Sequence, residues 1–184
     1  KSVLITGGTS GIGFAVAKAF LREGASVLIC GRSEERGRIA LAQLTDFGGE
    51  IRFLAADVRD ELMVKRLVQY AVDSFSNLDF AFNNAGVFLP EPALDDHSTG
   101  LWEDMIAANL TGVYLCLKHE ILAMRSVPLE SHRAIVNNAS IVAHRGSQSS
   151  GLAYTAAKHG VLGLTKQAAI NHVGDNIRVN AVSP

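Results

Sequence analysis

The sequence predicts a three-layer α/β domain in which a doubly wound parallel sheet carries helices on both faces. Two observations support this fold class. Short apolar runs that suit buried strands alternate along the chain with longer runs that suit helices. In addition, a glycine-rich turn follows the first apolar run and leads directly into a helical pattern, which is how a βαβ unit begins. Such alternation implies parallel strands joined by crossover helices.

Length and composition fit a single domain over residues 1–184. The chain is 48% hydrophobic and 19% charged, which suits a globular unit with a sizeable core. With 17 basic and 18 acidic residues the net charge is -1, so the composition argues against a surface for nucleic acid or for an anionic membrane. No apolar run reaches the ~18 residues that a membrane span needs.

Cysteine and histidine usage predicts neither a disulfide framework nor a metal site. Cys30 falls on an expected strand and Cys116 on an expected helix, and their spacing matches no metal-binding pattern. We therefore expect buried thiols in a reducing, cytoplasmic compartment. The 6 histidines are scattered without the carboxylate-flanked i, i+4 pairs of a metal site, so no metal is expected.

The first predicted βαβ unit occupies the first thirty residues. A strand over residues 2–5 is followed by the glycine-rich run 6–13 and by a helical pattern over 14–21. Such a turn lets backbone N–H groups approach a phosphate, and the helix N-terminus adds a favourable dipole, so a dinucleotide pyrophosphate fits there. The same glycines could form a mere tight connection, but a second strand over 26–30 completes the unit.

The end of the second strand bears on the choice of cofactor. NAD-preferring sites carry an acidic residue here that binds the ribose hydroxyls, whereas this chain has Gly31 followed by Arg32. A guanidinium suits the 2′-phosphate of NADP, so the sequence favours NADP, with NAD as the alternative. The competing interpretation is that Arg32 is an ordinary exposed loop cation.

The alternation continues to the end of the chain. Further helices are predicted over residues 34–47, 60–76, about 99–125 and about 153–173, and further strands over 51–56, 78–82, 134–140 and 177–182. The segment 126–133, which contains Pro128, is predicted to be a surface loop. Six strands then alternate with five helices, as a sheet covered on both faces requires.

Small and polar residues follow the third and fourth strands. Asp57 and Val58 come after the third, and Asn83-Asn84-Ala85-Gly86 after the fourth. The small residues of the second group could pass close to a flat ligand while the asparagine side chains tie neighbouring strand ends together. A purely structural turn would have the same chemistry.

Candidate catalytic residues gather between Ser140 and Lys158. Tyr154 and Lys158 stand four residues apart at the start of an Ala-rich helical run, which places them on one helical face. A fixed cation beside a phenol favours the phenolate, so Tyr154 would be a usable proton donor and acceptor. Ser140 follows the apolar run 134–136, a buried strand that delivers its hydroxyl to the same region. Asn109, inside an expected helix, is either a tolerated surface residue or a further member of this site.

These motifs occur together and in a fixed order along the chain. They are the glycine-rich turn 6–13, Asn83 to Gly86, Asn109, Ser140, Tyr154-x-x-x-Lys158 and Asn180 to Pro184. In this combination the chain closely resembles the short-chain dehydrogenase/reductase family over essentially its whole length. The resemblance implies a single NAD(P)-binding Rossmann domain.

The resemblance also implies roles for the matching residues. Tyr154 would be the catalytic acid/base, assisted by Lys158, which would also bind the nicotinamide ribose. Ser140 would hydrogen-bond the substrate oxygen, and Asn109 would hold a water that links the site to solvent. The cofactor-binding residues that it implies are Gly7, Thr9, Ser10, Gly11, Ile12, Gly13, Arg32, Asp57, Val58, Asn83, Ala85, Gly86, Tyr154, Lys158 and Pro184.

Within that set the resemblance assigns each part of the cofactor. Thr9, Ser10 and Ile12 would line the pyrophosphate, Asp57 and Val58 the adenine, Asn83 and Ala85 the adenosine ribose, and Pro184 the nicotinamide. We therefore expect an NADP(H)-dependent oxidoreductase that transfers a hydride between the nicotinamide and a small secondary alcohol/ketone substrate.

Two rival functions keep the same fold. A catalytically silent nucleotide-binding or regulatory protein would tolerate loss of Ser140, Tyr154 or Lys158, yet all three are present. Related dehalogenases lose the glycine-rich turn and replace the catalytic lysine by arginine, whereas this chain keeps both features. The resemblance further implies a homotetramer that packs the helices bearing Asn109 and Tyr154 between subunits.

Three features depart from the family pattern. The interval from Ser140 to Tyr154 is 14 residues, on the long side, so the loop 144–151 is expected to differ in shape. Ser10 stands where some NADP-preferring members carry a basic residue, which leaves Arg32 as the main argument for NADP. Family members continue past Pro184 with a substrate-covering loop and a further strand, so we expect this sequence to be a truncated version of a longer chain.

Overall fold

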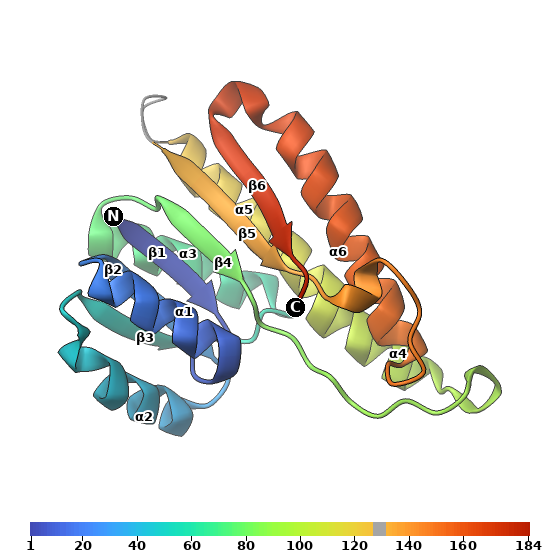
Figure 1. The fold of residues 1–184 in the computed structure, drawn as a ribbon. Helices are drawn as coiled ribbons and strands as arrows, with labels where there is room; N and C mark the ends of the chain where they lie inside the picture. Colours follow the sequence, from blue (N-terminus) through green and yellow to red (C-terminus); the bar gives the residue numbers. More distant parts are fainter. Residues whose placement is uncertain (127–131) are drawn as a thin grey trace.

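The computed structural model describes residues 1–126 and 132–184. It contains a six-stranded sheet with the order β3-β2-β1-β4-β5-β6, in which every neighbouring pair is parallel (Figure 1). The strands are β1 (Ser2–Thr6), β2 (Ser26–Gly31), β3 (Ile51–Ala55), β4 (Phe80–Asn83), β5 (Arg133–Asn138) and β6 (Ile177–Val182). The predicted doubly wound parallel sheet is confirmed.

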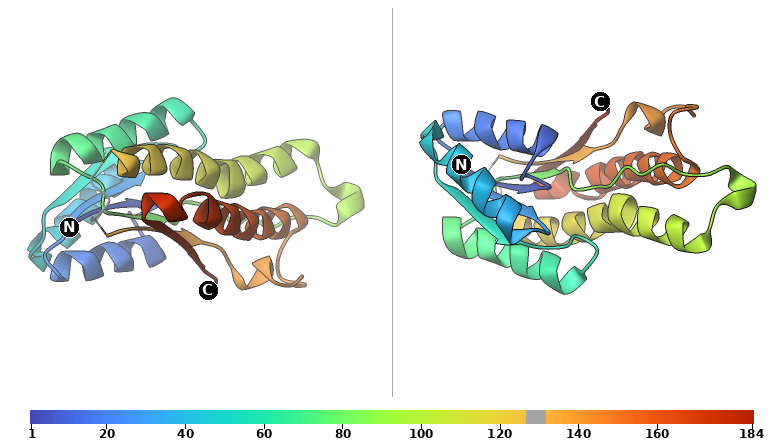
Figure 2. Two further views of the ribbon diagram at one scale, coloured as in Figure 1. Left: turned by 90° about the horizontal axis from the view of Figure 1, so that it is seen from above. Right: turned by 90° about the horizontal axis from the view of Figure 1, so that it is seen from below.

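Helices cover both faces of the sheet, as predicted. They are α1 (Gly11–Arg22), α2 (Glu34–Leu44), α3 (Glu61–Phe75), α4 (Thr99–Ile106), α5 (Gly112–Arg125) and α6 (Leu152–Asn171). Figure 2 shows α1 on one side of the sheet and α3 with α5 on the other. None of the helices in the described ranges is long and apolar enough to cross a membrane.

The two faces of β1 show how the strand residues divide between the helical layers. Val3 and Ile5 belong to the core cluster that contains residues of α1 and α2, whereas Leu4 belongs to the cluster with residues of α3, α5 and α6. Successive side chains of a strand point to opposite faces, so a strand covered on both sides must be apolar throughout. Burial of each such side chain stabilises the folded state by roughly 1.5–3 kcal/mol. The buried strands therefore hold their carboxyl ends, which carry the site, in fixed positions.

The strand order reverses beside β1. The chain passes from β1 outward to β2 and β3, then returns to place β4, β5 and β6 on the other side. In an open parallel sheet, the loops that leave the carboxyl ends of the strands part at such a switch point and leave a crevice for ligands. The crevice between the ends of β1 and β4 is therefore where a site is expected.

The helix predicted over 99–125 is continuous but not uniform. α4 passes into a π-helical turn, Ala107–Thr111, and this turn passes into α5. A π-turn places one more residue in the turn than an α-helix does, and such turns are frequent at functional sites. Asn109 lies within it and is fully buried, which excludes the interpretation of Asn109 as a surface residue.

The strand predicted over 134–140 ends earlier than expected. β5 stops at Asn138, and Ser140 instead precedes a short 3-10 helix, Ile141–Ala143. The other predicted elements agree with the structure to within three residues at each end. Of the loop predicted over 126–133, residues 127–131 lie outside the described residues.

Candidate active site

The turn between β1 and α1 has a backbone that requires glycine. Gly7 and Gly11 have φ angles of 64° and 56°, in the left-handed region that other residues rarely adopt. A Cβ on Gly13 would clash with the carbonyl oxygen of Gly7, so only glycine lets α1 approach the turn this closely. Ser10, the N-cap residue of α1, makes no side-chain hydrogen bond to the helix. The N–H groups in the first turn of α1 therefore receive no hydrogen bond acceptor from the Ser10 side chain. N–H groups of this kind at a helix N-terminus can bind an anion.

A pocket of about 700 Å³ opens beside this turn, at the carboxyl ends of β1 to β4. Seven predicted cofactor residues line it: Gly7, Thr9, Arg32, Asp57, Val58, Ala85 and Gly86. Residues that were not predicted also line it, namely Ser33, Arg36, Arg59, Val87 and Ala108 among others. The remaining predicted cofactor residues, which lie outside this lining, are Ser10, Gly11, Ile12, Gly13, Asn83, Tyr154, Lys158 and Pro184.

Arginines gather at the end of the pocket beside β2 and β3. Arg59 is held by Asp57, with Nε 3.1 Å from Oδ1 and Nη2 2.7 Å from Oδ2. This hydrogen bonding from Arg59 keeps the pKa of Asp57 below its usual value, and the nearby charge of Arg32 adds to the effect. Of the lining arginines, Arg32 and Arg36 form no ion pair with any described residue. Two guanidinium groups are therefore free to meet an anion here.

Gly31 occupies the place where an NAD-preferring site carries an acid. A Cβ at this position would lie 3.1 Å from Cγ2 and 3.2 Å from Oγ1 of Thr9, which is tighter than an ordinary contact. The strand end therefore leaves little space for a longer side chain, and the next residue is Arg32.

Asparagine side chains tie the ends of β1, β4 and β5 together, as predicted. The Asn84 amide donates to the carbonyl oxygens of Thr6 and Gly7, both at 3.1 Å, and accepts a hydrogen bond from Asn138 Nδ2 at 2.9 Å. Thr6 Oγ1 accepts hydrogen bonds from the N–H groups of Asn84 and Ala85, both at 3.0 Å. These hydrogen bonds set the spacing of the strand ends on either side of the crevice.

Below the strand ends lies a buried polar network. Asn83 Nδ2 donates to Glu120 Oε2 at 2.9 Å and to Asn137 Oδ1 at 3.0 Å, and Asn137 Nδ2 donates to Thr165 Oγ1 at 2.9 Å. Burial raises the pKa of Glu120 to about 7, and the hydrogen bond from Asn83 opposes that rise. The side chain of Asn83 is thus buried, bonds to Glu120 and Asn137, and does not line the pocket.

Tyr154 and Lys158 lie on adjacent turns at the start of α6. Lys158 Nζ is 5.5 Å from the centroid of the Tyr154 ring and donates a hydrogen bond to the carbonyl oxygen of Asn138 at 2.7 Å. Lys158 is only 4% exposed, and burial lowers its pKa to about 8. The predicted phenol and ammonium are therefore neighbours beside the end of β5.

Gly86 lies between Asn109 and Lys158. A Cβ on Gly86 would lie 2.6 Å from Asn109 Oδ1 and 3.9 Å from Lys158 Nζ. Asn109 Oδ1 accepts a hydrogen bond from Val87 N–H at 3.0 Å, and its Nδ2 donates to the Met105 carbonyl at 3.0 Å. The structure thus brings Asn109 and Lys158 together across a position with no room for a side chain.

Ser140 and Pro184 lie at the same edge of the sheet. The N–H of Val142 donates to Ser140 Oγ at 3.4 Å, and the N–H of Ile141 donates to the Pro184 carbonyl at 3.0 Å. The 3-10 helix that follows Ser140 packs against α6, the helix that carries Tyr154. The predicted residues Ser140 and Pro184 are thus placed beside α6.

One aromatic residue at the site was not predicted. The ring of Phe88, in the loop after β4, makes an edge-to-face contact with the Tyr154 ring, with centroids 5.0 Å apart and an interplanar angle of 77°. Phe88 is 59% exposed, so it also presents apolar surface next to the phenol. No local pattern could indicate this contact, because it joins loop and helix residues that are far apart in the sequence.

Comparison with known proteins gives one consistent family. The family model described as short chain dehydrogenase matches residues 1–184. The chain is 38% identical over 184 residues to the 3beta-hydroxysteroid dehydrogenase of Mediterraneibacter gnavus, covering 100% of this chain and 65% of that protein. It is 39% identical over 184 residues to the cis-4-hydroxycyclohexanecarboxylate dehydrogenase of Sinomonas cyclohexanicum, covering 100% of this chain and 72% of that one.

A solved structure gives the same result. The crystal structure of an actinorhodin polyketide ketoreductase with NADPH matches with a TM-score of 0.93 and 35% sequence identity, covering 100% of this chain and 69% of that chain. The chain thus spans about two thirds of the length of the relatives that it matches, 65% of the hydroxysteroid dehydrogenase.

Proposed function

The chain belongs to the short-chain dehydrogenase family, and from this membership we propose that it is an NADP(H)-dependent oxidoreductase acting on a secondary alcohol/ketone pair. The observation that carries the proposal is the pairing of Tyr154 with Lys158 beside the end of β5, with Asn109 across Gly86 from Lys158. A silent nucleotide-binding protein would have no need of a buried lysine next to this phenol.

The residues around the pocket fit a dinucleotide. Gly13 and Gly7 bring α1 and the turn together with no room for a Cβ, and the first turn of α1 offers N–H groups to a pyrophosphate. Asp57 and Val58, which are expected to bind the adenine, belong to the lining, and so do Ala85 and Gly86. When bound, the nicotinamide supplies or accepts the hydride.

NADP is the proposed cofactor, and NAD is the alternative. Gly31 has no carboxylate to bind a ribose 2′-hydroxyl. Arg32 and Arg36 lie in the same lining and form no ion pair with a described residue. Guanidinium groups bind phosphate through charge-assisted hydrogen bonds. Arg36, in the first turn of α2, would thus share the 2′-phosphate with Arg32.

In the reducing direction, Tyr154 would donate its phenolic proton to the substrate carbonyl oxygen, and Ser140 would hydrogen-bond the same oxygen. Lys158 would stabilise the resulting phenolate by its charge and bind the nicotinamide ribose. Asn109 would hold a water that returns a proton to the site, and the hydrogen bonds of its side chain to Val87 and Met105 would keep it in place. Oxidation would follow the same steps in reverse.

The substrate group beside the reacting carbon is proposed to be apolar and cyclic. Phe88 presents exposed aromatic surface at the edge of the Tyr154 ring. The names of two relatives, a 3beta-hydroxysteroid and a cis-4-hydroxycyclohexanecarboxylate dehydrogenase, denote alcohols carried on rings. An apolar ring next to Phe88 would gain an aromatic contact and lose little hydration.

Assembly as a homotetramer is proposed to use the face formed by α5 and α6. A shallow hollow between these helices has an apolar lining that includes Tyr114, Leu117, Leu122, Leu164 and Ala168. Tyr114 and Leu122 are exposed there, and apolar groups gathered on one face mark association surfaces. Light scattering should then show a smaller species for Leu122→Glu than for the unchanged protein.

A reducing cytoplasm is the proposed compartment. Cys30 and Cys116 are buried free thiols. Burial raises the pKa of Cys30 to about 12, which keeps this thiol protonated and unreactive. Two such thiols suit a compartment in which disulfides do not form.

The proposed function is tested with the full-length protein and a defined ketone panel. Cyclohexanone, 2-decalone and a 3-ketosteroid are offered with NADPH, and absorbance at 340 nm reports turnover. Tyr154→Phe should abolish turnover and keep NADPH binding, whereas Tyr70→Phe, on α3, should keep both. Undiminished turnover by Tyr154→Phe would overturn the assigned role. If neither NADPH nor NADH binds, the regulatory alternative replaces the enzyme.

A further inference from the structure

Helix α6, which carries Tyr154, has no cap from its own sequence neighbours. Its N-cap residue is Gly151, which has no side chain to accept a hydrogen bond, and its first turn contains no acidic residue. The first N–H groups of a helix have no partner within the helix and need one from elsewhere. Tyr154 is the third residue of this turn, so whatever satisfies these groups also sets the backbone beneath the phenol.

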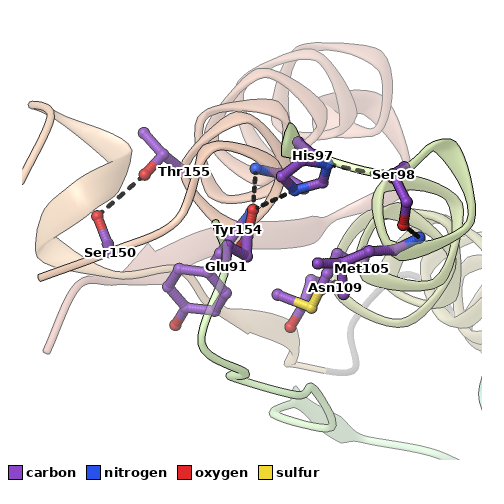
Figure 3. A network of polar contacts seen from close by, with 10 residues as sticks. Glu91, His97, Ser98, Met105, Asn109, Ser150, Tyr154 and Thr155 are labelled. Atoms are coloured by element: carbon purple, nitrogen blue, oxygen red, sulfur yellow. Dashed lines mark hydrogen bonds and ion pairs between the residues drawn. The ribbon is translucent and has the colours of Figure 1, made fainter. Parts of the chain in front are cut away.

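The missing cap comes from Glu91, more than sixty residues earlier in the chain (Figure 3). Its Oε2 accepts a hydrogen bond from the N–H of Ala153 at 2.7 Å, and its Oε1 accepts one from the N–H of Tyr154 at 3.0 Å. The Glu91 side chain is 0% exposed. A Cβ on Gly151 would overlap this carboxylate, so the glycine at the N-cap makes room for it.

His97 holds the carboxylate of Glu91 from the other side. His97 Nε2 is 2.8 Å from Glu91 Oε2, and His97 Nδ1 is 3.2 Å from the carbonyl oxygen of Ser98. Both ring nitrogens of His97 therefore face oxygen atoms, one of Glu91 and one of Ser98. Ser98 in turn caps α4, because its Oγ accepts a hydrogen bond from Leu101 N–H at 3.2 Å. These contacts thus link α6 to α4 through Glu91, His97 and Ser98.

The backbone on both sides of Glu91 has few allowed conformations. Pro90 and Pro92 flank this residue, and proline fixes its own φ and restricts the residue before it to extended conformations. Earlier in the same loop, Val87 is tied to Asn109, and Phe88 packs against the Tyr154 ring. Burial alone would raise the pKa of Glu91, but hydrogen bonds from Ala153, His97 and Tyr154 lower it, so the group is a carboxylate. The loop thus holds both the ring of Tyr154 and its backbone.

We propose that Glu91 is a positioning residue for the reaction, which fixes the first turn of α6 and thereby aims the phenol of Tyr154, with His97 holding Glu91 in place. The inference rests on the proposed catalytic role of Tyr154. Glu91 bonds to the backbone of Tyr154 and not to its hydroxyl, and in Figure 3 the Tyr154 ring extends away from the Glu91–His97 pair. Glu91 therefore affects the reaction by setting the position of Tyr154.

Asp60 provides a matched control, because it caps α3 with an equivalent pair of hydrogen bonds. Asp60 Oδ1 accepts from Leu62 N–H at 2.8 Å and from Met63 N–H at 3.1 Å. Removing this carboxylate takes away a helix cap but leaves α6 untouched. A loss that reflects general destabilisation would appear in both Asp60→Ala and Glu91→Ala, whereas a loss of positioning would appear only in the second.

The test uses full-length protein labelled with 3-fluorotyrosine and saturated with NADPH. Fluorine NMR follows the Tyr154 resonance, which is assigned with Tyr154→Phe, and NADPH oxidation with 2-decalone follows turnover. Glu91→Ala should shift or broaden this resonance and lower kcat by at least about tenfold, since small misplacements of reacting groups have large effects on rate. Affinity for NADPH should stay within about twofold. Glu91→Gln has one acceptor oxygen in place of two and can accept only part of this cap, so its kcat should lie between those of the unchanged protein and Glu91→Ala.

Two results would overturn the proposal. One is an unchanged Tyr154 resonance in Glu91→Ala, and the other is an equal change in Asp60→Ala. The resonance needs no turnover, so it tests the cap even if Tyr154 proves not to be the acid/base. If Tyr154→Phe retains full turnover, the proposed function fails while the fluorine signal still reports on Glu91.

Discussion

Lys158 Nζ lies 5.5 Å from the centroid of the Tyr154 ring, one helical turn away, and its one hydrogen bond to a described residue goes to the carbonyl oxygen of Asn138. Desolvation lowers the pKa of Lys158 from 10.5 to about 8. The fold therefore keeps an ammonium in surroundings that disfavour its charge. A buried charge that lowers the stability of the fold is expected to be kept for function. Substitution of Lys158 can therefore separate its effect on stability from its effect on turnover.

Lys158→Met should stabilise the protein at pH 7 while removing turnover. Because the folded state lowers the pKa of Lys158, the unfolded state binds more protons between about pH 8 and 10.5. The charge thus destabilises the fold fully below pH 8 and progressively less toward pH 10.5. The shift corresponds to at most roughly 3 kcal/mol, part of which the hydrogen bond to Asn138 offsets, so we expect a gain of about 1–2 kcal/mol. Urea unfolding at pH 7 and pH 10 measures the gain and its decrease.

Lys166→Met is the matched control for this prediction. Lys166 is exposed on the same helix, so its replacement should change the free energy of unfolding by less than about 0.5 kcal/mol and leave turnover intact. A Lys158→Met protein that is less stable than the unchanged protein at pH 7 would contradict the assignment of Lys158 as a strained cation.

Short-range geometry explains why the sequence predicted this pair. A spacing of four residues fixes the relation of Tyr154 to Lys158 once a helix forms, and α6 forms where the Ala-rich run predicts it. The glycine-rich turn was predictable for the same reason, since Gly7 and Gly11 adopt the positive φ angles that glycine allows. Both predictions needed only local conformation.

Arg32→Ala should weaken NADPH binding and leave NADH binding unchanged. Arg32 lies in the pocket lining next to Gly31 and carries no ion pair with a described residue, so its guanidinium is available to a 2′-phosphate. Loss of a charge-assisted contact of this kind should raise the Kd for NADPH by about tenfold or more. Fluorescence titration of the full-length protein with each nucleotide measures the two affinities.

Arg38→Ala controls for a general loss of positive charge. Arg38 is exposed on α2 and lies outside the pocket lining, so both affinities should be preserved. Equal binding of NADPH and NADH by the unchanged protein, with no effect of Arg32→Ala, would show that Arg32 is an ordinary loop cation and that the NADP preference is wrong.

Gly13→Ala should destabilise the protein and weaken cofactor binding. The added methyl would meet the Gly7 carbonyl and lie 2.6 Å from Asn84 Nδ2, so α1 or the turn would have to shift. Overpacking of this kind costs about 1–3 kcal/mol. Gly100→Ala, in α4 with nothing within 4 Å of the new methyl, should instead be neutral or stabilising by about 0.5 kcal/mol. Thermal unfolding compares the two, and equal destabilisation would contradict the close approach of α1.

Long-range contacts explain what the sequence could not predict. The cap from Glu91 to Tyr154 and the contact between Phe88 and Tyr154 depend on the path of a loop, which no spacing encodes. The π-turn around Asn109 likewise has no residue signature in a run that favours an ordinary helix. The same holds for Glu120, which lies on the expected helix but is buried and bonded to Asn83 at the end of β4.

Glu120 should make the stability of the protein fall as the pH rises. Burial raises its pKa from 4.5 to about 7, so the folded state binds more protons than the unfolded state between these values. The stability that protonated Glu120 contributes is therefore fully present below pH 4.5 and is lost as the pH rises through 7. A shift of this size corresponds to roughly 3 kcal/mol.

Glu120→Gln should remove this pH dependence, because its amide oxygen can still accept the hydrogen bond from Asn83 Nδ2 but cannot ionise. At pH 8.5 the variant should be more stable than the unchanged protein by roughly 2 kcal/mol, and near pH 4.5 the two should be nearly equal. Urea unfolding at both pH values measures the difference. Glu61→Gln serves as the control, because that exposed carboxylate is paired with Lys118 and its pKa is lowered, so no gain at high pH is expected. A Glu120→Gln effect of the same size at both pH values would mean that Glu120 stays ionised in the fold and that burial does not control its charge.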